Sequence, residues 1–150
     1  MSSLLPISRL LSYRLHRVAN AISRSAAARY RRDFDVSLGE WRTLALLGEE
    51  SPLTLNRLAA RAGLDKAQMS RVVARLDERG LLVREAGAGR STPLSLSRKG
   101  HSVYRGLIKA ANERNEAFLV CLTDEERRVL DSALEKLGKL AKALESQENL

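Results

Sequence analysis

Two short helical segments joined by a glycine occupy the middle of this chain, within residues 54–96. Residues 54–63 have the composition of a short helix that ends at its glycine. Residues 65–79 predict a second helix, because Asp65 favours the N-cap position and Gln68 completes a capping-box pair with it. Gly80 is placed to end this helix in a left-handed conformation. Two helices joined in this way form a helix-turn-helix.

The two faces of the second helix differ in chemistry. At about 100° per residue, an apolar stripe falls on the side that faces the core, made of Met69, Val72, Val73 and Leu76. Small, polar and basic residues share the other sides, and these are the predicted DNA contacts: Lys66, Ala67, Gln68, Ser70, Arg71 and Arg75. Small residues let a helix approach the major groove, where arginine reads guanine or phosphate, glutamine reads adenine and serine reads either. An ordinary solvated basic face is the alternative interpretation.

A β-hairpin is predicted directly after the second helix. Residues 81–85 and 93–97 have the patterns of two strands, and Leu53 is expected to pair briefly with them as a third strand. The connecting residues are rich in glycine and carry one cation, Arg90. An arginine at the tip of such a wing suits the minor groove, where negative potential is concentrated. The whole stretch therefore predicts a winged helix-turn-helix.

These motifs resemble the MarR family of bacterial transcription regulators over nearly the whole chain. The matching segments are residues 41–47, 58–64, 70–76, 79–82 and 96–100. The resemblance implies a mainly α fold with a small β wing, in which N- and C-terminal dimerisation helices flank the winged domain. Wings of the family usually carry an acidic residue shortly before the arginine, but here residues 87–89 are Gly-Ala-Gly. Arg90 therefore lacks its usual orienting carboxylate.

Helices on both sides of the winged domain complete a single protomer of 150 residues. We expect the winged domain at residues 34–98 and a helical dimerisation region at 1–33 and 99–150. The first helix is predicted over residues 7–32, with a seam at Leu4, Leu11, Leu15, Val18 and Ile22. This arginine- and serine-rich stretch also has the composition of an organelle transit peptide, but its apolar spacing favours a structural helix.

The other predicted helices have recognisable ends. Ser37 caps a helix that runs to residue 50, where Ser51-Pro52 ends it. Ser97 caps a helix that runs to about residue 122 and buries Phe118. The last helix follows a capping box at Thr123 and carries a heptad-like apolar stripe at Leu130, Ala133, Leu134, Leu137, Leu140, Ala141 and Leu144.

Neither terminal apolar stripe has an obvious partner of sufficient size within the chain. A two-fold axis would let the stripes bury each other, so we expect a homodimer, with an intrachain helix pair as the alternative. Two recognition helices about 34–36 Å apart would then read a pseudo-palindrome.

The chain has a formal net charge of +8, but residues 1–33 contribute seven arginines and one acid to it. The more informative balance is local. Residues 52–98 hold nine basic and four acidic side chains, which favours double-stranded DNA as the partner.

Several functions find no support in the sequence. The single cysteine excludes an intrachain disulfide and favours the reducing cytoplasm, and no apolar run approaches the roughly 18 residues that predict a transmembrane helix. His16 and His101 have no ligands at metal-binding spacing, and no nucleophile or phosphate-loop motif is present. We therefore expect no metal, no cofactor, no membrane partner and no enzymatic activity.

The resemblance also implies control by a small aromatic or amphipathic anion, bound where the dimer helices meet the winged domain. The candidate ligand residues are Tyr13, His16, Arg17, Trp41 and Arg42, although Trp41 also fits the core. Cys121 could sense oxidants, but its apolar neighbours predict a buried structural cysteine. The predicted function is a ligand-responsive repressor, with a winged-helix protein-interaction module or a redox-sensing regulator as alternatives.

Overall fold

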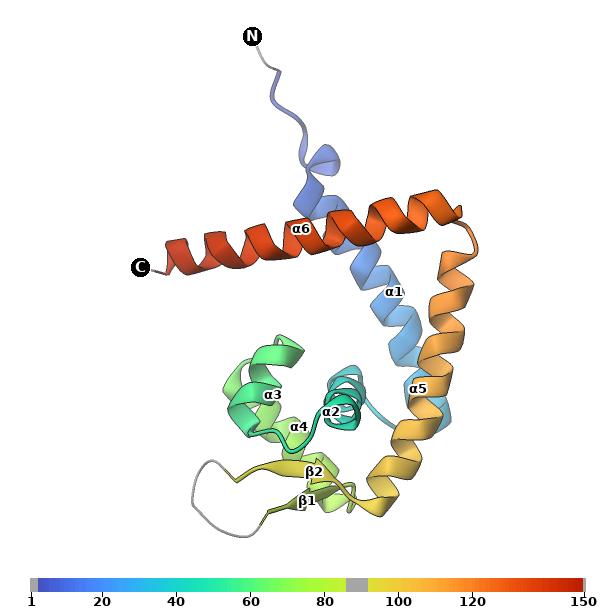
Figure 1. Cartoon of the computed structure of the whole chain (residues 1–150), viewed down its shortest axis with the longest axis vertical. Helices are drawn as coiled ribbons and strands as arrows, with labels where there is room; N and C mark the ends of the chain where they lie inside the picture. The colour runs from blue at the N-terminus through green and yellow to red at the C-terminus, as the bar shows by residue number, and fades with distance from the viewer. Residues whose placement is uncertain (1–2, 86–91, 150) are drawn as a thin grey trace. The chain divides into compact units, whose positions relative to one another are not determined.

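The computed structural model describes residues 3–85 and 92–149. Its helices are α1 (Leu11–Phe34), α2 (Leu38–Glu49), α3 (Leu55–Ala62), α4 (Lys66–Glu78), α5 (Arg98–Leu119) and α6 (Asp124–Glu148). Strands β1 (Leu82–Arg84) and β2 (Leu94–Leu96) form one antiparallel sheet (Figure 1). The predicted class, mainly helical with a small β wing, is confirmed. The chain divides into two compact units, residues 1–111 and 112–150.

The core of the first unit lies among α2, α3, α4 and the two strands, which cluster together in Figure 1. The predicted apolar stripe of α4 faces this core, since Met69, Val73 and Leu76 are at most 1% exposed and Val72 is half-buried. Buried leucines from the surrounding elements pack around the stripe: Leu44, Leu47, Leu58, Leu81, Leu94 and Leu107.

The predicted helix ends of the helix-turn-helix are confirmed. The Asp65 carboxylate accepts the backbone N–H of Gln68 at 2.7 Å, and the Gln68 side chain accepts the N–H of Asp65 at 3.1 Å. Thr54 caps α3, and Gly63 and Gly80 have φ angles of 68° and 71° after α3 and α4. Glycine suits these left-handed positions, because it has no Cβ and so adopts a positive φ without a steric clash.

The wing begins as predicted, with shorter strands. Leu82 pairs with Leu96 and Arg84 with Leu94. An isolated bridge from Leu53 to Leu94 confirms the brief pairing of Leu53, but the described residues form no third strand there. The wing tip, with Arg90, lies outside the described residues.

Two predicted helix boundaries are wrong. The first helix begins at Leu11 and not at residue 7, because Ile7–Arg9 closes a separate 3-10 turn and Leu10 is extended. Helix α5 ends at Leu119 and not near residue 122, where a turn leads into α6.

In the second unit, Thr123 caps α6 by accepting the N–H of Glu126 at 3.1 Å. The Arg127 guanidinium donates to the Leu119 carbonyl at 2.7 and 3.1 Å and so ties α6 to the end of α5. Two burial predictions here are wrong: Phe118 is 42% exposed and Cys121 is exposed. Both side chains lie near the α5–α6 turn, where no described core element of the chain covers them.

The start of α5 is joined closely to the end of α4. The Ser97 hydroxyl donates to the Gly80 carbonyl at 2.6 Å and accepts the N–H of Gly100 at 3.0 Å, as its predicted capping role requires. A Cβ on Gly100 would lie 2.1 Å from the carbonyl oxygen of Leu81. Only glycine therefore allows this approach of α5 to the chain entering β1.

We predict that Gly100→Ala lowers the free energy of unfolding by at least about 2 kcal/mol, because the added methyl forces a backbone shift. Urea unfolding followed by circular dichroism measures the change. Gly138→Ala is the matched control: a Cβ there meets no atom within 4 Å, and alanine favours a helix over glycine by up to about 1 kcal/mol. Equal stability of Gly100→Ala and the wild type would contradict the close contact.

Candidate nucleic-acid interface

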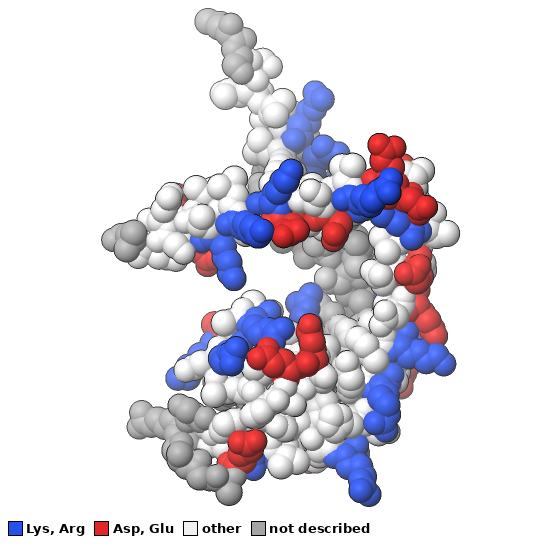
Figure 2. Space-filling view, in the orientation of Figure 1, with Lys and Arg blue, Asp and Glu red and all other residues white. Residues whose placement is uncertain are grey.

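Helix α4 presents its predicted DNA-contact residues on a continuous exposed surface. Lys66, Ala67, Gln68, Ser70, Arg71 and Arg75 are all exposed, whereas the apolar stripe of the same helix is covered. On the face of the molecule seen in Figure 2, basic and acidic side chains are interspersed. Local geometry, and not total charge, therefore identifies the candidate interface.

A groove runs between the exposed side of α4 and the start of α2. Gln68, Arg71 and Arg75 line it from α4, and Ser37, Gly39 and Glu40 line it from the α2 end. The two helices approach closely here, since a Cβ on Gly39 would lie 3.2 Å from Val72. Within the described part of the chain, Arg71 has no ion-pair partner. Its guanidinium is available to an anion.

The Gln68 side chain caps α4 and is also exposed to a ligand. Its Oε1 accepts the N–H of Asp65, and an amide oxygen has a second lone pair. The amide NH₂ and this lone pair retain the donor and the acceptor that bidentate recognition of adenine needs. The contact of Gln68 with a base therefore stays a prediction.

A buried carboxylate lies beside these exposed residues, and the sequence analysis missed it. Glu40 is 1% exposed, and its oxygens lie 3.4 Å from Arg75 Nε and 3.6 Å from Arg79 Nη1. The spacing of Ser37 and Glu40 as a capping box could have indicated part of this role. Nothing local indicated that Arg75 of α4 and Arg79, directly after this helix, would reach the same carboxylate.

Among the described residues, the pKa values that depart clearly from their ordinary values belong to Arg32 and Asp33, at the end of α1 and away from this groove. The Arg32 side chain donates to Asp33 at 2.9 Å, and this hydrogen bond lowers the pKa of the Asp33 carboxyl below its ordinary value. Both groups are solvent-exposed, so the pair does not bear on the interface.

Residues 34–91, which contain this helix-turn-helix, match the family model described as the MarR family. The HTH-type transcriptional repressor Rv2887 of Mycobacterium tuberculosis is 29% identical over 133 residues, covering 85% of this chain and 93% of the relative. The winged helix-turn-helix region of this chain is therefore similar to that of the MarR family of transcription regulators.

Solved structures carry the same fold. A MarR/EmrR-family regulator from Acinetobacter sp. ADP1 has a TM-score of 0.85 and 24% identity, covering 93% of this chain and 99% of the other. MepR of Staphylococcus aureus, solved in complex with DNA, has a TM-score of 0.79 and 19% identity, covering 88% and 98% of the two chains. At these identities, the matches show that this chain has the winged-helix fold.

The structure does not bring together the five candidate ligand residues. Tyr13 and Arg17 line a groove on α1, with the Arg17 guanidinium 5.9 Å from the Tyr13 ring, and His16 instead contacts Asn20 at 2.9 Å. Trp41 packs against Tyr30, 5.2 Å away between ring centroids. Tyr13 and Tyr30 are about 25 Å apart along α1 at 1.5 Å per residue, so residues at both ends of α1 cannot hold one small ligand within a chain.

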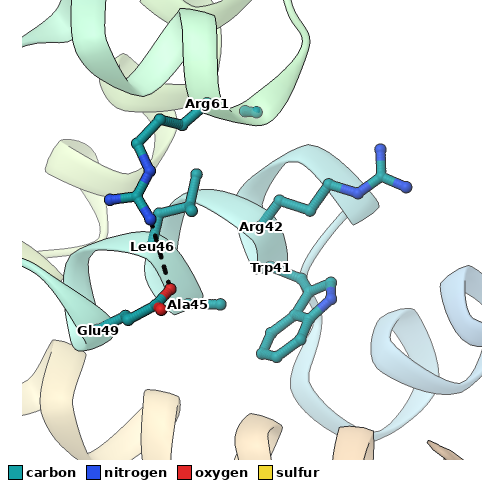
Figure 3. Close-up of a pocket in the computed structure, with 7 residues that line it drawn as sticks. Trp41, Arg42, Ala45, Leu46, Glu49 and Arg61 are labelled. Atoms are coloured by element: carbon teal, nitrogen blue, oxygen red, sulfur yellow. Dashed lines mark ion pairs between the residues drawn. The ribbon is translucent and has the colours of Figure 1, made fainter. Parts of the chain in front are cut away.

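Trp41 and Arg42 instead belong to a pocket of about 240 Å³ between α2 and α3. Figure 3 shows both side chains projecting from α2, while Arg61 enters from α3. Arg61 is already neutralised by Glu49, 3.5 Å away, and by Glu50, whereas Arg42 has no ion-pair partner among the described residues. The α3 side of this pocket was not predicted, because it depends on how α3 packs on α2.

Among the described residues, no three His, Cys, Asp or Glu side chains gather as a metal site would require, and no helix has the length and apolarity to span a bilayer. Cys121 is exposed, and its Sγ donates to the Phe118 carbonyl at 3.2 Å.

Proposed function

We propose that this chain is a homodimeric repressor of the MarR family that binds a pseudo-palindromic DNA site and releases it when a small anion binds. The observation that carries the proposal is the exposed surface of α4, where small residues alternate with basic and polar ones on a helix whose opposite side is fixed in the core. The repressor name of the mycobacterial relative and the DNA complex of MepR support it.

Each exposed residue of α4 has a role that follows from its chemistry. Arg71 and Arg75 contact phosphate or guanine, while Gln68 and Ser70 contact base edges. Lys66 neutralises a phosphate near the start of the helix, and Ala67 allows close approach to the groove. Arg90, on the wing, contacts the minor groove, as the sequence analysis predicts.

The proposed dimer buries the two apolar stripes at the ends of the chain. On α1, Leu11, Leu15 and Val18 are 55%, 41% and 60% exposed. On α6, Leu134 and Leu140 are 50% and 57% exposed. Exposed apolar surface of this extent along two helices is typical of an interface. We expect a second copy of the chain to cover these stripes, because it carries apolar stripes of the same length and composition.

Release of DNA follows from the dimer geometry. Two recognition helices bind neighbouring half-sites only at a spacing of one DNA turn, about 34–36 Å. An effector that binds more tightly to a conformation with a different spacing shifts the population away from the DNA-binding state. The pocket of Trp41 and Arg42 on α2 is the proposed effector site, where the indole stacks on an aromatic ring and the guanidinium binds a carboxylate.

We predict that the protein prefers DNA from upstream of its own gene over unrelated duplex by about a thousandfold or more at roughly 150 mM salt. Arg71→Ala should weaken binding to the preferred DNA by roughly 1–3 kcal/mol, because it removes an unpaired contact residue. Fluorescence anisotropy titrations measure both quantities.

Lys109→Ala is the matched control for charge, since Lys109 is an exposed cation on α5 outside the α4 surface. The affinity of this variant for the preferred DNA should equal that of the wild type. Wild-type affinity of Arg71→Ala would remove Arg71 from the site. Equal binding of the wild-type protein to both duplexes would contradict sequence-specific regulation and favour a protein-interaction module with an acidic partner.

For the dimer, we predict that Leu134→Glu converts the protein to monomers at micromolar concentration, because a charge in the apolar stripe cannot be buried without a partner. Sedimentation equilibrium gives the mass. Ser132→Glu adds the same charge on the opposite side of α6 and should leave the dimer intact. A monomeric wild type, or a dimeric Leu134→Glu variant, would refute this assignment of the interface.

For the effector, we predict a saturable change in the fluorescence of Trp41, the single tryptophan of the chain, on titration with a hydroxybenzoic acid. Arg42→Ala should abolish it, because the carboxylate loses its cation. Arg17→Ala should leave it unchanged, since Arg17 lies on the separate groove of α1. The site is wrong if no saturable change occurs or if Arg17→Ala has the larger effect.

A further inference from the structure

Glu40 is a charged side chain in a position where burial is costly. It lies in the first turn of α2, and its carboxylate is 2% exposed. Capping accounts for one part of its bonding, since Oε2 accepts the N–H of Ser37 at 3.3 Å. A neutral glutamine would serve that purpose equally well. The retained charge therefore calls for cationic partners, and a buried carboxylate is tolerated only when it is paired.

Arg79 is the first of these partners, and it connects Glu40 to the end of α1. Its Nη1 lies 3.6 Å from Glu40 Oε2 and donates to the Asp35 carbonyl at 2.7 Å, while Nη2 donates to the Phe34 carbonyl at 3.4 Å. Asp35 has a left-handed φ of 53°, so the backbone turns sharply where Arg79 holds it. One guanidinium thus binds both the α1–α2 junction and the buried carboxylate.

Arg75 is the second partner, and it differs from Arg79 in its exposure. Its side chain is 62% exposed, and it approaches Glu40 through Nε, at 3.4 Å from Oε1. Within the described residues, its two Nη groups have no ion-pair partner. A guanidinium held at Nε keeps its outer edge available for a phosphate or for the O6 and N7 atoms of guanine.

We propose that Glu40 is a positioning residue for DNA recognition: it orients the guanidinium of Arg75 and, through Arg79, couples that orientation to the end of α1. This inference rests on the proposed DNA-binding function and assigns a specificity role to a residue that does not touch DNA. Contact residues recognise best when neighbouring groups fix their geometry. The carboxylate also reduces the positive potential beside the interface, which disfavours non-specific attraction to phosphate.

Glu40→Gln tests the proposal with little change in shape. Glutamine preserves the capping box but removes the charge that holds Arg75. With a duplex that the wild-type protein selects from a random-sequence pool, we expect the ratio of specific to non-specific affinity to fall by about tenfold. Non-specific affinity should rise, because the variant has one negative charge fewer near the DNA. In an Arg75→Ala background, the same substitution should lower the ratio much less, because only the effect of the lost charge on non-specific binding remains.

Thr123→Ala is the control for a merely structural role. It removes the side-chain cap of α6, a helix that carries neither arginine and no residue of the groove, so it should lower the free energy of unfolding while the affinity ratio stays at the wild-type value. Three results would overturn the proposal: an unchanged ratio in Glu40→Gln, an equal loss when Arg75 is absent, or an equal loss in Thr123→Ala. If the wild type selects no preferred duplex, the proposed function itself fails, which is a separate outcome.

Discussion

The packing of one apolar stripe of α4 determines which side chains this protein presents to a partner. Met69, Val73 and Leu76 are buried against leucines of α2, α3 and the wing, and each stabilises the fold by about 1.5–3 kcal/mol. Burial of the apolar side fixes the rotation of the helix about its own axis, and this rotation determines which residues are exposed. The surface of small, polar and basic residues on α4 is therefore a direct consequence of core packing, and its orientation is as stable as the core.

The sequence predicted the features that depend on local chemistry. The capping pair of Asp65 and Gln68, and the left-handed glycines after α3 and α4, are set by a few neighbouring residues, so they could be read without the fold. Features that depend on distant residues could not be predicted. The ion pairs of Glu40 with Arg75 and Arg79 require α2 and α4 to pack first, and the pocket of Trp41 requires α3 to lie against α2.

The two failed burial predictions and the divided ligand set concern the helices outside the helix-turn-helix. An apolar residue such as Phe118 is expected in the core, but 42% of it is exposed. The apolar positions of α6 share this property, and in the proposed homodimer a second copy of the chain would cover them. The ligand set is divided for another reason. Tyr13 and Arg17 lie near the start of α1, whereas Trp41 packs on Tyr30 near its end, so the length of the helix keeps them apart.

Footprinting by hydroxyl radicals on DNA from upstream of the gene tests the central claim most directly, because it reports the protein's contacts along both strands at once. A dimer of winged helix-turn-helix protomers predicts two protected half-sites related by two-fold symmetry, with centres one helical turn, about 10–10.5 base pairs, apart. Arg71→Ala should weaken both half-sites together. A single asymmetric protected tract, or uniform cleavage at saturating protein, would contradict the account.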